Sequence, residues 1–334
     1  MGHVATDGVL RVGIIGAGGA AGQHVRALGR VGGTQIVGVA ARDRGRAAAL
    51  VATTASGASA AIYEDATRML DESRPDLAFV ALPPHLAGEA CSLLVERRIP
   101  FLVEKPLATD PETPVRLAAT IERLAMVVAV GYDWRGLDFL PEVRRRFAER
   151  PPRLVVARWL GDTPPPTWWR HVDEGAGQVV EQATHLYDIA RQLLGEARVV
   201  AARAAVHERP EHPDADVADV GAALLEFDGG AIGAFANTCL LAGSIIEIEF
   251  ASEGLRTSIR HGGTWPDVTW TVTFDDGGPI VERGAVRNPW DVQAEAFLAA
   301  VRAGEPGLVL ATYADALRTD RLTRAVVAAA GVQG

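Results

Sequence analysis

The chain of 334 residues is poor in cysteine and in long apolar runs, and each shortage excludes a class of protein. Its two cysteines, Cys91 and Cys239, lie far apart and outside any CxxC spacing, so we expect no disulfide framework and no metal site. No apolar run reaches the roughly 18 residues that a membrane span requires. Residues 1–8 lack a charged segment followed by an apolar one, so we expect no export signal and a cytoplasmic protein.

Positive charge is also in short supply. The formal net charge is −9, whereas a protein that binds nucleic acid needs a basic surface to neutralise phosphates. The hydrophobic content of 48% and charged content of 22% are typical of a soluble globular protein. We therefore expect a small-molecule partner, with neither nucleic acid nor membrane involved. The length favours two domains.

The first part of the chain alternates apolar runs with segments of helical spacing, which is typical of a parallel α/β sheet. The expected strands are Leu10–Ile15, Gln35–Ala41, Leu77–Leu82, Phe101–Glu104 and Val127–Tyr132. The expected helices are Gly19–Val31, Arg44–Thr53, Leu86–Arg97 and Pro111–Leu124. Together they predict a doubly wound Rossmann domain over residues 8–132.

The pattern changes at residue 133, where we place the boundary of a second, α/β domain over residues 133–334. A helix is expected over Leu137–Glu149, then a loop rich in proline and tryptophan, then a helix over Gln178–Leu194. Strand patterns with short Asp-Gly-Gly turns follow from Val199 to Val281 and indicate a large open antiparallel sheet. The closing helices, near Pro289–Arg302 and Thr312–Ala330, are free to pack back on the first domain.

A glycine turn joins the first strand to the first helix. It reads Gly16-Ala17-Gly18-Gly19-Ala20-Ala21, a GxGxxA pattern in the strand-turn-helix context that a dinucleotide site requires. Gly16 permits the sharp turn, Gly18 lets backbone amides approach a pyrophosphate, and the small Ala21 permits close packing of helix on strand. We expect all six residues to contact the cofactor.

The end of the second strand bears on the choice of cofactor. An acid there would bind the ribose 2′-hydroxyl of NAD, whereas an arginine accommodates the 2′-phosphate of NADP. The strand ends in Ala41 followed by Arg42, so NADP is favoured over NAD. Two alternatives stay open: Arg42 is simply solvated, or a shift of one residue makes Asp43 the ribose ligand.

Lys105 is the only lysine of the chain, which otherwise uses arginine for positive charge. It lies between an apolar strand and Pro106, at the carboxyl end of a parallel strand, where open sheets bind ligands. A compact ammonium group at this place indicates catalysis.

A polar stripe marks the expected helix Gln178–Leu194. Gln178, Glu181, His185 and Asp188 follow one another at steps of three, four and three, which would place them on one helical face. The spacing alone favours a solvated face.

Several motifs together resemble the glucose-fructose oxidoreductase, inositol dehydrogenase and rhizopine catabolism family, over essentially the whole chain. They are the glycine turn, Pro83-Pro84-His85-Leu86, Glu104-Lys105-Pro106, Gly131-Tyr132 and the segment from Gly177 to Asp188. The run Ala40-Ala41-Arg42-Asp43 is similar to that of dihydrodiol dehydrogenases of this family, which use NADP.

The resemblance implies a Rossmann domain followed by an open sheet that forms a homodimer or homotetramer. It also implies that an aspartate four residues before a histidine lines the nicotinamide pocket with that histidine and the lysine. Lys105 and His185 match this motif, and Glu181 stands in place of the aspartate, with a side chain that is longer by one methylene group. Because of this motif, we interpret the polar stripe as part of the active site and not as a solvated face.

The expected reaction is hydride transfer between nicotinamide and a secondary alcohol or ketone of a sugar, cyclitol or related small polyol. We assign His185 as general acid/base, Lys105 as the cation at the reacting oxygen, and Glu181 as the group that positions them; the roles of lysine and histidine are exchangeable. Further cofactor contacts are expected at Leu82, Pro83, Pro84, His85, Glu104 and Lys105. Substrate contacts are expected at Trp134, Arg135, Trp169, Arg170 and Asp188, with packing as the alternative.

Two other functions stay open. A relative of this family could be a dinucleotide sensor without turnover. It could also be a glycosidase in which the hydride returns to the substrate within one cycle.

Overall fold

The computed structural model describes residues 8–331, so the N-terminal residues on which the export expectation rests lie outside it, as do residues 332–334. The described chain forms two compact units, which are taken separately below. The first contains the chain up to Gly136 together with Asn288–Leu317. The second contains Leu137–Arg287 and the chain from Arg318 onward. No helix in the described part of the chain is both long and apolar enough to cross a membrane.

The first unit is built on a six-stranded parallel sheet in the order β3-β2-β1-β4-β5-β6. Its strands are β1 (Leu10–Ile15), β2 (Thr34–Ala40), β3 (Ala61–Tyr63), β4 (Leu77–Val80), β5 (Phe101–Val103) and β6 (Val128–Val130). Its helices are α1 (Gly19–Val31), α2 (Arg44–Val51), α3 (Ala66–Ser73), α4 (Pro84–Glu96), α5 (Glu112–Arg123) and α10 (Pro289–Ala303), with short turns η1 (Ala55–Gly57), η2 (Asp133–Gly136) and η4 (Pro306–Leu308). The doubly wound Rossmann fold is confirmed.

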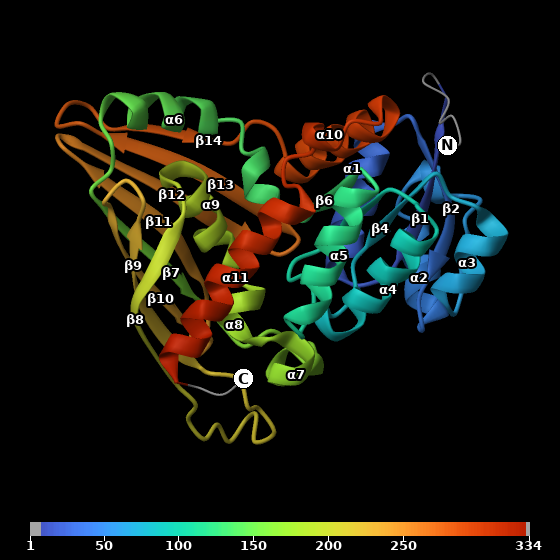
Figure 1. Ribbon diagram of the computed structural model, residues 1–334, viewed down its shortest axis with the longest axis horizontal. Coiled ribbons are helices and arrows are strands. Elements are labelled where there is room, and N and C mark those ends of the chain that lie inside the picture. Colours follow the sequence, from blue (N-terminus) through green and yellow to red (C-terminus); the bar gives the residue numbers. More distant parts are fainter. Residues whose placement is uncertain (1–7, 332–334) are drawn as a thin grey trace. The chain divides into compact units, whose positions relative to one another are not determined.

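The two faces of this sheet carry separate apolar cores, which is why its strands are apolar on both sides. Val12 and Ile14 face a core completed by α1, α2 and α10, whereas Ala78 and Val80 face a core completed by α3, α4 and α5. Helix α10 comes from the far end of the sequence and lies beside α1 (Figure 1). A late helix therefore completes the cover over the first strand.

The second unit is built on an eight-stranded sheet in the order β14-β13-β12-β11-β7-β10-β9-β8. Its strands are β7 (Leu154–Leu160), β8 (Ala197–Ala205), β9 (Val220–Phe227), β10 (Ile232–Thr238), β11 (Ile245–Ser252), β12 (Leu255–Thr264), β13 (Asp267–Asp275) and β14 (Val281–Gly284). All neighbours pair antiparallel except β7 with β10. The expected large, mostly antiparallel sheet is confirmed.

Helices cover one face of this sheet. They are α6 (Leu140–Glu149), η3 (Thr167–Arg170), α7 (Val172–Gly175), α8 (Gly177–Glu181), α9 (Thr184–Leu194) and α11 (Tyr313–Ala330), whose first residues, to Leu317, belong to the other unit. Side chains of β7 alternate between buried and exposed, so Val155 and Ala157 face inward while Leu154 and Val156 face out. One face of the sheet therefore presents apolar side chains to the surface.

The continuous helix expected over Gln178–Leu194 is wrong. The chain forms two helices, α8 and α9, joined at Gln182 and Ala183. At the join the amide of Ala183 donates to the carbonyl of Gln178, five residues back, at 2.9 Å. This wider turn changes the phase between Glu181 and His185, so the polar residues do not form one straight stripe.

Candidate active site

The glycine turn is shaped by the neighbouring strand. Gly16 has φ +111°, and a Cβ at this position would lie 2.1 Å from the carbonyl oxygen of Ala81, directly after β4. The amide of Gly16 donates to the carbonyl of Ala40 at 2.9 Å. Only glycine fits here, because both the backbone angle and the contact exclude a side chain.

The other glycines of the turn face outward. Gly18 is the N-cap of α1, Gly18 and Gly19 are exposed, and a Cβ on Gly18 would meet nothing within 4 Å. Ala21 is fully buried and packs into the core. Exposed amides at a helix N-terminus fit the pyrophosphate of a dinucleotide, since they supply hydrogen-bond donors and the positive end of the helix dipole.

Asp43 is the N-cap of α2. Its carboxylate accepts a hydrogen bond from the amide of Arg46 at 2.9 Å. Arg42 is exposed, and Ala41 is partly buried. The capping bond accounts for Asp43 within the fold, which leaves Arg42 as the side chain at this strand end that is suited to a 2′-phosphate.

The ends of β1, β4, β5 and β6 lie along one edge of the sheet, because the four strands are parallel neighbours. Pro83 caps α4 after β4, Pro84 is buried, and His85 is exposed in the first turn of that helix. Glu104 and Lys105 follow β5 directly; Glu104 is buried, while Lys105 is partly buried. The sheet order reverses between β1 and β4, which is where doubly wound folds bind their ligands.

Two acidic side chains lie close to Lys105 in this unit. Nε2 of His24 in α1 is 2.7 Å from Oε1 of Glu104. Burial, together with the negative charge of Glu104, raises the pKa of Asp133 to about 8, while the positive charge of Lys105 acts in the opposite direction. Asp133 is therefore a neutral acid near pH 7.

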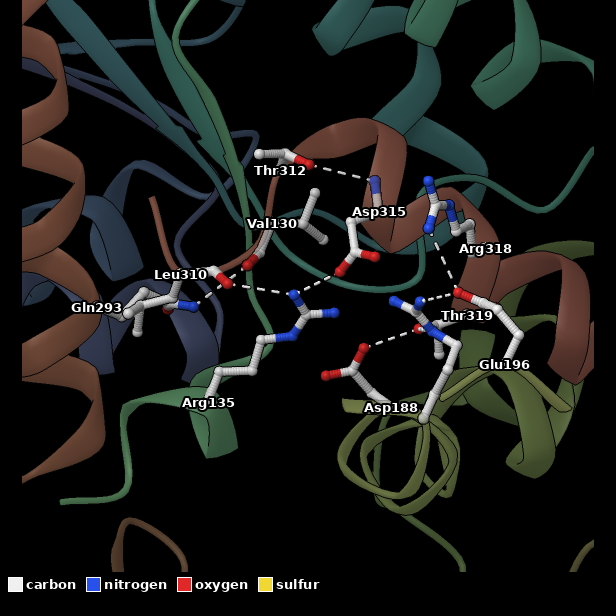
Figure 2. A network of polar contacts seen from close by, with 11 residues as sticks. Val130, Arg135, Asp188, Glu196, Gln293, Leu310, Thr312, Asp315, Arg318 and Thr319 are labelled. Atoms are coloured by element: carbon white, nitrogen blue, oxygen red, sulfur yellow. Dashed lines mark hydrogen bonds and ion pairs between the residues drawn. The ribbon is translucent and has the colours of Figure 1, made fainter. Parts of the chain in front are cut away.

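Trp134 and Arg135 belong to η2 of the first unit. Trp134 is 2% exposed. Nη1 of Arg135 lies 2.6 Å from Oδ2 of Asp315 and donates to the carbonyl of Leu310 at 3.1 Å (Figure 2). These contacts match the packing alternative, and substrate contact by either residue stays a prediction.

The second unit holds Glu181 and His185 on its covered sheet face. Nε1 of the buried Trp169 donates to Oε2 of Glu181 at 2.8 Å, which fixes one oxygen of the carboxylate. The His185 ring is 8% exposed and stacks on Trp159 of β7, with ring centres 6.0 Å apart. The interpretation of the polar stripe as a solvated face is wrong, since Gln178, His185 and Asp188 are all buried.

Arg170 and Asp188 have local partners in the same unit. Nη1 of Arg170 is 3.0 Å from Nδ1 of His212. Asp188 is fully buried and accepts a hydrogen bond from the hydroxyl of Thr319 in α11 at 2.7 Å (Figure 2). Asp188 thus braces α9 against α11, and its contact with substrate stays a prediction.

The sequence reasoning missed three aromatic or ionisable residues near these candidates. Trp159, His261 and Trp270 occupy one row across β7, β12 and β13, next to His185. Burial lowers the pKa of His261 to about 4, so its ring is neutral at physiological pH. Alternation within a strand shows which residues share a face, but the register between strands, which brings these three residues together, is not visible in the sequence.

His24 was also missed, although a signal existed. It sits three residues after Ala21 and four before Leu28, both buried on the inner face of α1. A titratable residue at a core position of an amphipathic helix indicates a buried partner.

Comparison with known proteins then identifies the family. The profile described as an oxidoreductase family with an NAD-binding Rossmann fold matches residues 10–132, and the profile of the corresponding C-terminal domain matches residues 151–278. The chain belongs to the Gfo/Idh/MocA oxidoreductase family. The protein is therefore an NAD(P)-binding oxidoreductase.

Curated relatives in the Gfo/Idh/MocA family include sugar and cyclitol enzymes. Inositol 2-dehydrogenase 1 of Saccharopolyspora erythraea is 32% identical over 37% of this chain and 36% of its own. The rhizopine catabolism protein MocA of Rhizobium meliloti is 27% identical over 56% of this chain and 57% of its own. The chain thus matches between about a third and three fifths of the length of these two relatives.

Solved structures of similar fold cover nearly the whole chain. KijD10, a 3-ketoreductase from Actinomadura kijaniata in complex with NADP and TDP-benzene, superposes with a TM-score of 0.82 at 22% identity, over 96% of this chain and 97% of its own. A levoglucosan dehydrogenase in complex with NADH and levoglucosan gives a TM-score of 0.79 at 20% identity, with the same coverage. At these identities the likeness establishes the fold of a Gfo/Idh/MocA oxidoreductase.

Proposed function

We propose that the protein is an NADP-preferring dehydrogenase or reductase that acts on a secondary alcohol or ketone of a sugar, cyclitol or related small polyol. The observation that carries the proposal is the position of Lys105. This lysine, the only one of the chain, follows β5 at the ligand-binding edge of the sheet. Strand β5 lies next to β4, and Ala81, directly after β4, packs against Gly16 of the glycine turn. The inositol 2-dehydrogenase among the relatives supports a cyclitol, and the levoglucosan dehydrogenase of similar fold supports a sugar.

The residues of the first unit fit a dinucleotide. The exposed residues Gly18 and Gly19 stand at the N-terminus of α1, and the open space at Gly18 admits a pyrophosphate. When bound, the nicotinamide supplies the hydride acceptor or donor. Lys105 holds the reacting oxygen of the substrate and stabilises negative charge on it, because an ammonium group is a compact positive charge.

His185 moves the proton in the proposed reaction. A neutral imidazole accepts the hydroxyl proton during oxidation and returns it during reduction. Stacking on Trp159 limits the rotation of the ring, and the hydrogen bond from Trp169 fixes the carboxylate of Glu181, which orients a substrate hydroxyl or the imidazole. Lys105 and His185 belong to different units, and the family motif is the ground for assigning them to one reaction.

A turnover assay tests the proposal. The protein is mixed with NADP⁺ or NAD⁺ and a panel of sugars, inositols and small polyols, and reduced nicotinamide is followed by absorbance. We expect turnover on at least one ring polyol, faster with NADP⁺. Dinucleotide binding without turnover on any compound would favour a sensor, and cleavage of glycosides without net absorbance change would favour internal hydride return.

Arg42 is expected to select NADP. Replacing Arg42 by alanine should weaken NADPH binding by about tenfold or more, because a charge-assisted hydrogen bond contributes roughly 1.5–3 kcal/mol, and should leave NADH binding unchanged. Fluorescence titration with both dinucleotides measures this. Arg68→Ala, which removes an exposed arginine paired with Glu72 on α3, serves as the matched control. Tighter binding of NADH than NADPH by the wild-type protein would remove the role of Arg42.

The exposed sheet face is proposed to form the interface of a homodimer or homotetramer. On this face Leu154 of β7 lies opposite Ile232 of β10. Ala234 of β10 lies between Val156 of β7 and Leu224 of β9, so these side chains form a contiguous apolar patch. The four large side chains of this patch are 39–49% exposed. Next to it, Glu247 bridges Arg158 and Arg260 at 2.6 and 2.7 Å. An apolar patch with a charged rim favours self-association.

A charge in the patch should prevent this association. Val156→Asp is expected to yield monomers in light scattering after size-exclusion chromatography, because each interface would bury an unpaired carboxylate. Val115→Asp introduces the same charge on exposed α5 and should leave the assembly intact. A monomeric wild-type protein, or a Val156→Asp variant of unchanged size, would contradict the sheet interface.

A further inference from the structure

Glu104, the residue before Lys105, forms a buried pair with His24. The two residues are 7% and 1% exposed, and Nε2 of His24 lies 2.7 Å from Oε1 of Glu104. The imidazole also contacts two aromatic rings, Phe79 of β4 at 5.0 Å and Trp290 of α10 at 4.9 Å between centres. A polar pair in apolar surroundings is tightly fixed, since the cost of breaking it includes an unpaired buried group.

The direction of the hydrogen bond follows from the surroundings of the ring. Within residues 8–331, Nδ1 of His24 is buried and has no hydrogen-bond partner. A proton on Nδ1 would therefore be unsatisfied, which places the ring proton on Nε2. His24 donates this proton to the carboxylate of Glu104.

Gly131 holds the carboxylate from another side. A Cβ on Gly131 would lie 2.5 Å from Oε1 of Glu104, so the carboxylate rests directly on the backbone that follows β6. The amide of Glu104 donates to the carbonyl of Val80 in β4 at 2.9 Å. Glu104 is thus tied to α1, β4 and the end of β6, and Lys105 is its immediate neighbour in the chain.

Asp133 shows that the charges of this cluster act on one another. Burial makes the largest contribution to the raised pKa of Asp133. The negative charge of Glu104 raises this pKa further, whereas the positive charge of Lys105 lowers it. Glu104 and Lys105, which are adjacent in the chain, therefore act on Asp133 in opposite directions. Moving Glu104 would therefore change both the position and the electrostatic surroundings of Lys105.

We propose that His24 is a positioning residue for the reaction: it holds the Glu104 carboxylate and thereby fixes the turn from which Lys105 presents its ammonium group. The inference rests on the proposed function of Lys105. It gives a role to a histidine that is buried between α1 and its neighbours. It also accounts for the glycine at position 131, where a Cβ would displace the Glu104 carboxylate.

Three variants test the proposal. His24→Leu removes the donor, His24→Gln keeps an amide donor near Nε2, and Gly131→Ala displaces the Glu104 carboxylate while leaving His24 and Lys105 in the chain. His24→Leu and Gly131→Ala should lower kcat by about 10- to 100-fold, the effect of a misplaced catalytic group, while NADPH affinity stays within about twofold. His24→Gln should retain most of kcat.

A second readout needs no substrate. Because Lys105 is the only lysine, reductive methylation with ¹³C-formaldehyde yields a single lysine dimethylamino signal, distinct from that of the N-terminal amine. We expect this signal to narrow in His24→Leu and Gly131→Ala, because a released side chain moves on the nanosecond timescale, and to stay broad in His24→Gln.

Phe297→Leu is the matched control. Phe297 packs on Phe79 in the same core, with ring centres 5.4 Å apart, and its side chain has no polar group. It should lower thermal stability without changing kcat or the Lys105 signal. Equal losses of kcat in Phe297→Leu and His24→Leu at equal stability, or an unchanged Lys105 signal in His24→Leu, would overturn the proposal. If Lys105→Ala keeps full turnover, the function of Lys105 fails separately, and the signal alone still decides whether His24 holds the turn.

Discussion

Replacing Lys105 by alanine is expected to lower kcat by about 10²- to 10⁴-fold, the range for loss of a positioned acid-base or charge-stabilising group. The variant should keep its fold, because the Lys105 side chain is partly exposed. Dinucleotide affinity should change far less than kcat, since the glycine turn is untouched. Steady-state kinetics on the best substrate of the panel, together with NADPH titration, measure both quantities.

Two comparisons sharpen this test. Lys105→Arg should not restore turnover, because a planar guanidinium cannot replace a compact ammonium at the reacting oxygen. A small amine in the buffer should restore part of the rate to Lys105→Ala. Wild-type kcat in a folded Lys105→Ala variant with saturating cofactor would show that Lys105 takes no part in the chemistry.

Gly16→Ala and Gly18→Ala should affect different properties: the first should lower the stability of the fold, and the second should weaken dinucleotide binding. Gly16→Ala combines a Cβ 2.1 Å from the carbonyl oxygen of Ala81 with a φ of +111°, so the free energy of unfolding should fall by on the order of 3 kcal/mol or more. Gly18→Ala places a Cβ in open space on an extended backbone and should leave stability unchanged. It should nevertheless weaken dinucleotide binding by at least about tenfold, because the methyl group occupies the approach of the pyrophosphate.

Thermal unfolding and NADPH titration of the two variants separate these effects. Each variant serves as the control for the other, since the added group is the same. A Gly18→Ala protein that binds NADPH as tightly as wild type would show that the dinucleotide does not lie on this turn.

The first unit was largely predictable because its signals are local. The strand Leu10–Ile15 and the helix Gly19–Val31 have the bounds expected from the apolar run and the glycine turn. The strand Ala61–Tyr63 and the helix Ala66–Ser73 were missed, since a strand of three residues carries no readable period. The spacing of apolar residues along the sequence therefore predicted the longer helices and strands, but it did not predict the short strand at the edge of the sheet.

The second unit depends on pairings that are distant in sequence. Leu154–Leu160 was not expected as a strand, yet it lies in the middle of the large sheet between β10 and β11. The strands that pair with it, β10 and β11, begin only at Ile232 and Ile245, and the proline-rich segment lies between them and β7 in the sequence. The break between α8 and α9 was also hidden, because apolar spacing continues through Gln182 and Ala183.

The candidate site was predicted residue by residue, but its supports were not. Lys105 stood out as the only lysine, and the family motif pointed to His185 and Glu181. The partners that hold these residues are His24 for Glu104, Trp169 for Glu181 and Trp159 for His185. These contacts join distant segments, so they follow from packing and not from spacing.

Hydride transfer can be measured directly with the best substrate of the panel, deuterated at its carbinol carbon and mixed with stoichiometric NADP⁺ for a single turnover. Mass spectrometry then locates the label. We predict deuterium on the reduced dinucleotide with wild-type protein, and none with Lys105→Ala over the same time. Deuterium that stays on a cleaved or unchanged sugar, with the dinucleotide recovered in its oxidised form, would contradict an NADP-dependent dehydrogenase.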